Sequence, residues 1–157
     1  MKFIKKHLFI LIILLVLLWL FLVILTASNQ NQGDNKKMIG ARLGSCVFSL
    51  EIVSDPLSWY KGLSHREALD QDKGMIFIFP DKKTRTFVMR EMNFPLDIIF
   101  LKDKKVINIE QANLEIAKDN NLREYKSQDE SNMVVEINQG LSKKCEIKTD
   151  TTLKFLD

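Results

Sequence analysis

Short apolar runs separated by polar turns make up most of the chain after residue 45. Residues 47–53 alternate apolar and polar side chains, which predicts a half-buried strand. Residues 75–79 are apolar throughout and lie between Gly74 and Pro80, which predicts a strand buried on both faces. Further extended segments are predicted at residues 84–89, 96–101, 106–110, 133–138, 147 and 153–156, with residues 81–83 and 102–105 as charged turns. The polar stretch at residues 116–132 is expected to be a long loop.

A helical insertion is expected between the first two strands. Ser54-Asp55-Pro56 combines capping residues with a proline in the first helical turn, where its missing N–H is harmless. Ser64-His65-Arg66-Glu67 matches a capping box, so a second helical turn is expected to run to Leu69. The sequence therefore predicts a mainly β, single-domain fold over residues 46–157, either a β-sandwich or a partly closed barrel with a short helical insertion.

Before this domain, a run of eighteen apolar residues without charge, Gly or Pro begins at Leu8 and ends at Leu25. As a helix it would be roughly 27 Å long, close to the ~30 Å core of a bilayer. Three lysines precede it, which favours a cytoplasmic N-terminus and an extracytoplasmic remainder. Residues 1–27 are therefore expected to be a signal anchor, a single transmembrane helix that holds the protein at the cell membrane. A signal peptide cleaved near residues 26–28, which would release a secreted protein, is the alternative.

Residues 28–45 are expected to form a flexible tether, because residues 28–37 are polar and lack aromatic and β-branched side chains. The formal net charge of the chain is +3. Residues 1–37 carry it, with five lysines against Asp34 alone, whereas the remainder has 18 basic and 19 acidic residues. The basic balance belongs to the N-terminal segment and gives no support for nucleic-acid binding.

Cys46 and Cys145 are the only cysteines. An extracytoplasmic compartment permits a disulfide between them, which would close a loop of about 100 residues and contribute up to about 4.7 kcal/mol. Two separately packed free thiols are the alternative. Their spacing fits no metal-site pattern.

Several short motifs stand in an order that resembles one known family. They are Gly62-Leu63, Arg66, Leu69, Gly74-Met75, Phe77, Phe79, Phe87, Met89, Pro95-Leu96-Asp97-Ile98-Ile99-Phe100, Val135-Glu136 and Gly140. In this order they resemble the domain of unknown function 192 family, over residues 48–155. The resemblance implies a small, mostly β, sandwich-like domain, often exported or membrane-anchored in prokaryotes. It implies no activity.

The chain departs from the family's pattern in two places. After Phe87 the family usually has Trp-Met-Lys-Asn-Thr, whereas residues 88–92 here read Val-Met-Arg-Glu-Met. Near the end the family usually has Gly-Asp, where this chain has Thr149 and Asp150. If the family's tryptophan or its Asn-Thr pair touches a ligand, a different ligand is expected here.

The charged residues within apolar strands are the candidates for chemistry, because a buried charge costs free energy unless it is paired, hydrogen-bonded or near water. Asp97 shares a face with Ile99 and Leu101 by alternation. It is either a cleft carboxylate that binds a ligand or exchanges a proton, or a structural carboxylate that accepts backbone N–H bonds after Pro95 or pairs with an arginine.

Glu136 faces opposite to its neighbours Val135 and Ile137 and could be a second carboxylate beside Asp97. Paired carboxyl groups serve acid–base hydrolysis, with their spacing setting the outcome. Arg66 could clamp an anion, because a guanidinium forks onto carboxylate or phosphate. The alternative for Arg66 is a structural salt bridge to Asp97 or Glu136.

The methionines and histidines give little support for a metal or catalytic site. The methionines could suggest copper(I) ligation but form no cluster, and core filling is preferred for Met75, Met89, Met92 and Met133. His65 is the single histidine of the domain, so neither a His-based metal site nor a Ser-His-Asp triad is expected. No cofactor and no metal are predicted.

Three functions therefore stay open. The preferred one is a membrane-tethered, non-enzymatic module that binds a small ligand, a wall polymer or an envelope protein, with Arg66, Met89, Asp97 and Glu136 as contact residues. The second is a hydrolase or lyase that uses Asp97 and Glu136. The third is a purely structural envelope protein, which predicts no cleft.

Overall fold

The computed structural model of the chain describes residues 12–23, 37–115 and 122–156. It separates into two units, Met1–Asn35 and Lys36–Asp157. In the first unit, residues 12–23 form a helix with exposed side chains, and the predicted apolar run begins and ends outside the described residues. Among the described ranges, no helix is long and apolar enough to span a membrane.

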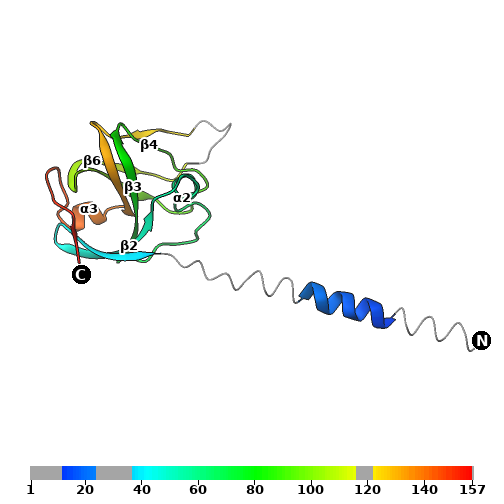
Figure 1. Cartoon of the computed structure of the whole chain (residues 1–157). Helices are drawn as coiled ribbons and strands as arrows, with labels where there is room; N and C mark the ends of the chain where they lie inside the picture. The colour runs from blue at the N-terminus through cyan, green and yellow to red at the C-terminus, as the bar shows by residue number, and fades with distance from the viewer. Residues whose placement is uncertain (1–11, 24–36, 116–121, 157) are drawn as a thin grey trace, which may run out of the picture. The chain divides into compact units, whose positions relative to one another are not determined.

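The second unit is mainly β, as predicted, and its main sheet curls into a half-barrel (Figure 1). Within the described residues, seven strands form this sheet in the order β6 (Lys105–Ala112), β5 (Leu96–Lys102), β8 (Ser131–Asn138), β3 (Lys73–Lys83), β2 (Cys46–Val53), β1 (Met38–Leu43) and β9 (Lys154–Phe155). Neighbouring strands are antiparallel except β2 and β3, which are parallel. A separate small sheet pairs β4 (Thr86–Phe87) with β7 (Tyr125–Lys126). Two short helices, α2 (Pro56–Lys61) and α3 (Leu141–Lys144), complete the unit.

The first strand lies where the sequence predicted tether. Residues 38–43 form β1 and pair with β2 from Met38 opposite Glu51 to Leu43 opposite Cys46. The expectation of a tether through residue 45 is therefore wrong. The physical reason is that Ala41 and Leu43 alternate with more exposed residues and are buried in the core, a pattern too short to stand out beside Gly40.

The predicted second helical turn at residues 64–69 is also wrong. His65 has a φ of 63°, which is left-handed and incompatible with a helix. Tertiary hydrogen bonds replace the capping box: the Ser64 hydroxyl donates to the Arg90 carbonyl at 2.8 Å, and the His65 N–H donates to the Glu91 carbonyl at 2.9 Å. These bonds tie the segment after α2 to residues 90–91.

Three smaller differences concern the ends of elements. Residues 81–83, expected as a turn, continue β3 beyond a register shift. Ile147, expected in a strand, follows α3, a helix that was not predicted. The expected long loop contains β7 and the first residues of β8, and residues 116–121 within it lie outside the described residues.

The main sheet buries side chains on both faces, and the two faces have separate cores. One face, called here the α3 face, packs Leu50, Ile76, Ile99 and Val135 with Leu141 of α3. The other, called the α2 face, packs Met75, Phe77, Ile98, Phe100 and Val134 beneath the segments that follow α2 and β4. Successive residues of a strand point to opposite faces, so β3, β5 and β8 contribute to both cores.

The C-terminal segment connects the two edges of the curled sheet. The Val106 N–H of β6 donates to the Thr151 carbonyl at 2.9 Å, and the Leu153 N–H donates to the Lys104 carbonyl at 2.8 Å. A few residues later, β9 pairs with β1 through Ala41 opposite Phe155. Residues 150–155 therefore run from the β6 edge to the β1 edge.

A disulfide joins Cys46 at the start of β2 to Cys145 at the end of α3, with an S–S distance of 2.07 Å. The question that the sequence left open is thus answered in favour of a bond. The Ser45 N–H donates to the Cys145 carbonyl at 2.8 Å. Gly44 has a φ of +62°, and a Cβ there would lie 2.0 Å from the same carbonyl oxygen, so this approach requires glycine.

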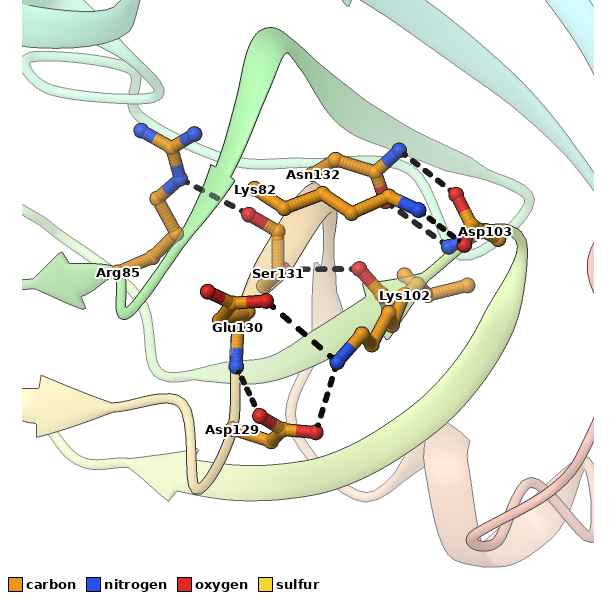
Figure 2. A network of polar contacts seen from close by, with 9 residues as sticks. Lys82, Arg85, Lys102, Asp103, Asp129, Glu130, Ser131 and Asn132 are labelled. Carbon is orange, nitrogen blue, oxygen red and sulfur yellow. Dashed lines mark hydrogen bonds and ion pairs between the residues drawn. The ribbon is translucent and has the colours of Figure 1, made fainter.

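A polar network fastens the β5–β6 hairpin to the end of β3 and the start of β8 (Figure 2). Lys82 pairs with Asp103 at 2.5 Å, and Lys102 pairs with Asp129 at 3.0 Å. The Asp103 N–H donates to the Asn132 side chain at 2.9 Å. The predicted hairpin at residues 102–105 is confirmed. The network also holds the segment that leads into β4, because the Arg85 side chain donates to the Ser131 carbonyl.

Candidate functional site

A pocket of about 370 Å³ lies on the α2 face of the sheet. This volume is within the range of small-molecule sites, ~300–1,000 Å³. Three parts of the chain line it: residues 59–64 of α2 and the turn after it, residues 83–90 and Met92 around and after β4, and side chains from the sheet itself. The sheet contributes Phe77, Phe79, Leu96 and Glu136.

Aromatic rings form the pocket walls. Trp59 and Phe79 lie with ring centroids 4.9 Å apart, and Phe87 meets Phe77 edge-on at 4.9 Å. Such geometries are favourable for aromatic pairs and hold the rings in place. The Trp59 indole N–H donates to the Val53 carbonyl at 3.2 Å, which orients its ring. The pocket therefore presents flat apolar surfaces to a ligand.

Local sequence explains where α2, which lines the pocket, begins and ends. The Asp55 carboxylate accepts the N–H bonds of Leu57 and Ser58, both at 3.1 Å, and so caps the helix as predicted. Gly62 ends the helix with a φ of 48°, a conformation that favours glycine. Between these two stops, the helix presents Trp59 and Tyr60 to the pocket.

Four cationic side chains line the pocket, but two of them are engaged. Arg85 is buried; it donates to the Asp81 carboxylate at 2.5 Å and to the Ser131 carbonyl at 3.1 Å, and its guanidinium lies 3.9 Å from the Phe79 ring centroid. Lys83 pairs with the same Asp81 at 3.1 Å.

The other two cations are more available. The Arg90 guanidinium lies 4.3 Å from the Tyr60 ring centroid. Neither Arg90 nor Lys61 forms an ion pair with any residue that the structure describes. Lys61 is exposed and Arg90 is half-buried, so both charges lie toward the solvent side of the pocket.

Glu136 is the acidic residue of the pocket lining, and its side chain is only 6% exposed. It projects from β8 between Met75 of β3 and Ile98 of β5. No hydrogen bond joins its carboxyl group to the described part of the chain. Burial raises the pKa of Glu136 to about 8, against the opposing effect of the nearby Arg66 charge. At neutral pH this carboxyl is therefore mostly protonated and able to donate a hydrogen bond.

Arg66 lies behind the pocket and is held by Glu51. One terminal nitrogen of its guanidinium lies 2.9 Å and 2.7 Å from the two Glu51 carboxylate oxygens. The sequence named Asp97 or Glu136 as its partner, and that expectation is wrong for the ion pair. Glu51 escaped notice because alternation in residues 47–53 placed it on the polar side of a half-buried strand, whereas this side is covered by the segment after α2.

Asp97 is fully buried on the α3 face. One of its carboxylate oxygens, Oδ2, accepts the Gly140 N–H at 2.9 Å and the Ser142 N–H at 2.8 Å. The structural interpretation of Asp97 is therefore correct in kind. The donors come from the first turn of α3 rather than from the backbone after Pro95.

Strand register separates the two carboxyl groups. Asp97 is opposite Ile137, whereas Glu136 is opposite Ile98. Because neighbours across strands share a face and successive residues do not, Asp97 and Glu136 point to opposite sides of the sheet. A hydrolase or lyase site that uses both residues on one substrate is therefore excluded.

Of the four predicted contact residues, the structure brings Met89 and Glu136 to the pocket. Met89 is 3% exposed and also belongs to the core of the α2 face. Sequence reasoning missed the walls, Trp59, Phe79 and Phe87, and the rim charge Lys61. Their signal was the aromatic pair Trp59-Tyr60 just after the Asp55-Pro56 helix start and the phenylalanines at 77, 79 and 87, but single aromatic positions are more often core. Within the described ranges, no three His, Cys, Asp or Glu residues are grouped to hold a metal ion.

Two crystal structures share this fold. A protein of unknown function from Novosphingobium aromaticivorans DSM 12444 is 26% identical, with a TM-score of 0.71, over 79% of this chain and 89% of its own. A protein from Sinorhizobium meliloti 1021, provisionally described as a transcription regulator, is 21% identical, with a TM-score of 0.70, over 76% of this chain and 95% of its own. No curated protein matches the chain.

The sequence also matches a protein family over residues 40–155. The match extends from β1 to β9 and includes the pocket, the disulfide and the buried carboxyl groups of Glu51, Asp97 and Glu136. The family is DUF192, described as "Uncharacterized ACR", which agrees with the resemblance seen in the ordered motifs. The chain belongs to the DUF192 family.

Proposed function

We propose that this domain is a binding module for a small organic ligand, which it holds in the pocket on the α2 face. The carrying observation is the buried Glu136 carboxyl at the pocket, which has no hydrogen-bond partner among the described residues. Among the described residues, Asp97 Oδ1 is the buried side-chain oxygen without a hydrogen-bond partner, so the Glu136 carboxyl oxygens keep contact with solvent in the pocket. A ligand that meets this carboxyl therefore replaces water and gains a hydrogen bond that no protein group occupies.

The aromatic walls of the pocket indicate the shape of ligand that fits. Trp59, Phe79 and Phe87 offer ring faces and edges, and a flat or cyclic ligand gains the most contact there. A purely structural envelope protein predicts no cleft, so the pocket argues against that role. An enzyme using Asp97 is not supported, since that residue lies on the α3 face.

We further propose that the domain is tethered to the outer side of a cell membrane by its N-terminal apolar run. The run of eighteen apolar residues after three lysines supports this location. The Cys46–Cys145 disulfide supports it too, because such bonds persist in oxidising compartments. Two experiments test this location. Protease added to intact spheroplasts should digest the domain. In untreated cells, the full-length protein should stay in the membrane fraction after alkaline washing. Recovery of a protected, reduced, soluble protein would contradict the location.

A thermal-shift screen with ring-bearing acids, alcohols, amines and sugars tests the binding function. Compounds that bind should raise the melting temperature of the full-length chain, because a ligand stabilises the folded state that it binds. The matched variants are Trp59→Ala and Leu57→Ala, both on α2. Trp59 lines the pocket, whereas Leu57 is 83% exposed and does not. Only Trp59→Ala should abolish the shift. No shift by any compound, or equal loss in both variants, would overturn the proposal.

A further inference from the structure

Resting on this binding function, we infer that the ligand is an organic anion with a flat apolar body. Its acidic group meets Lys61 and Arg90 at the solvent side of the pocket, its body lies against the aromatic walls, and one of its oxygen atoms accepts a hydrogen bond from Glu136. The supporting observations are the charged side chains that line the pocket and the ion pairs that some of them already form.

The lining charges favour an anion over a cation. Arg85 and Lys83 share Asp81, which leaves them partly neutralised. Lys61 and Arg90 have no ion pair within the described residues, and both line the pocket. A cationic ligand would meet four positive side chains, whereas an anionic ligand would find two that lack a counterion. Arg90 also lies on the Tyr60 ring, which holds its guanidinium near the pocket entrance.

The surroundings of Glu136 suit the same ligand. On the strands beside it, Met75 and Ile98 face it and carry no charge. The segment after α2 contributes Arg66, whose charge is largely taken up by Glu51 of β2. The remaining charged groups that line the pocket are Lys61, Lys83, Arg85 and Arg90. Burial outweighs the charge of Arg66 and raises the pKa of the Glu136 carboxyl to about 8. A protonated carboxyl donates to a ligand oxygen, and its ionised form would repel an anion.

Three probes with the same ring and different charges test the charge preference. Benzoate, benzyl alcohol and benzylamine are titrated into the full-length chain at pH 7 by calorimetry. Benzoate should bind at least about tenfold more tightly than the other two. Arg90→Gln should weaken benzoate about tenfold and leave benzyl alcohol unchanged. Lys148→Gln, a change away from the pocket, is the matched control and should alter neither.

The pH dependence tests Glu136. The probe is 4-methoxybenzoate, which carries a second oxygen away from its carboxylate. Its affinity should be level from pH 6 to about 8 and then fall about tenfold per pH unit, as expected when one proton must be retained for binding. Glu136→Gln keeps a neutral donor of the same shape, so its affinity for 4-methoxybenzoate should stay level through this range. Glu130→Gln, an exposed glutamate outside the pocket, should keep the wild-type profile.

The outcomes separate the inference from the function on which it rests. If benzyl alcohol or benzylamine binds as tightly as benzoate, the anion preference is wrong and the binding function stands. If Glu136→Gln shows the same fall above pH 8 as the wild type, the role of Glu136 is wrong. If no probe binds and the wider screen also finds nothing, the binding function itself is wrong.

Discussion

Two carboxyl groups are buried on neighbouring strands of this domain, and they do opposite things. Asp97 on β5 accepts two backbone N–H bonds from the start of α3. Glu136 on β8 receives no hydrogen bond from the described chain and lines an open pocket. Burial alone therefore does not identify a functional acid. Access separates the two: Asp97 is sealed on the α3 face, with Oδ2 bonded to the backbone and Oδ1 without a partner among the described residues, whereas Glu136 faces the pocket.

The two faces of the sheet repeat this contrast. The α3 face is sealed by a helix, a disulfide and the C-terminal segment. The α2 face is covered by loops. Edge-on aromatic pairs and hydrogen bonds from side chains to the backbone hold these loops, and a pocket remains between the loops and the sheet. Changes on the α3 face should therefore cost stability, and changes on the α2 face should alter binding.

The largest effect is expected from the disulfide. Replacing Cys46 and Cys145 by alanine releases a loop with a sequence separation of 99 residues. The chain-entropy model gives a loss of about 4.7 kcal/mol in the free energy of unfolding. Urea unfolding of the variant measures this, with reduced wild type as the control. Benzoate binding per folded molecule should be unchanged, and its loss would show that the two faces are not independent.

Glu136 should make stability depend on pH. Its folded-state pKa lies above its ordinary value, so between about pH 4.5 and about pH 8 the folded state holds more proton than the unfolded state. Raising the pH through this window therefore favours unfolding, by a total on the order of 4 kcal/mol, and the effect levels off above pH 8.

Urea denaturation of the wild type and Glu136→Gln across pH 5–9 measures this dependence. The glutamine variant should lack the decline and be the more stable protein at pH 8. Parallel curves for the two proteins would mean that Glu136 ionises without penalty, and the contrast with Asp97 would then disappear.

Asp97→Ala should destabilise the domain by roughly 3 kcal/mol at pH 7. The Gly140 and Ser142 N–H groups lose their acceptor, and hydrogen bonds to charged groups are worth about 1.5–3 kcal/mol each. Equilibrium unfolding measures the loss. Asp97→Asn keeps an acceptor oxygen and should recover part of the stability. A loss no larger than that of Glu136→Gln would remove the structural assignment of Asp97.

The smallest effect is expected at the pocket entrance. Tyr60 is 70% exposed and contacts the Arg90 guanidinium. Tyr60→Ala should change stability by less than about 1 kcal/mol, the usual worth of an exposed cation–π contact. It should nevertheless weaken benzoate binding several-fold, because Arg90 is no longer held. Calorimetry on Tyr60→Ala beside Leu57→Ala separates this positioning from a general effect on α2.

The sequence was informative where structure is decided locally. The alternation around Asp97 correctly grouped it with Ile99 and Leu101, and that around Glu136 correctly set it opposite Val135 and Ile137. Register between β5 and β8 is not local, because about 30 residues separate the two strands. That register alone decides that the two acids point to opposite faces.

The errors have the same origin. Ser64 and Glu67 match a capping box, yet hydrogen bonds to residues 90–91 draw the chain into a left-handed turn at His65. Glu51 has the polar alternation of a solvent-facing residue, yet Arg66 comes to cover it from a distant segment. The pocket walls come from segments that are far apart in the sequence, so local patterns could not predict that they meet.

The C-terminal segment has a consequence for how the domain is made. Residues 150–155 pair with β6 and then β1, so both of these strands lack a partner on one side until the segment has been synthesised. Unpaired strand edges are templates for aggregation. Translation proceeds at ~5–20 residues per second, so such a delay lasts for seconds after β1 has emerged. The nascent domain therefore keeps two unpaired strand edges, at β6 and β1, until residues 150–155 are available.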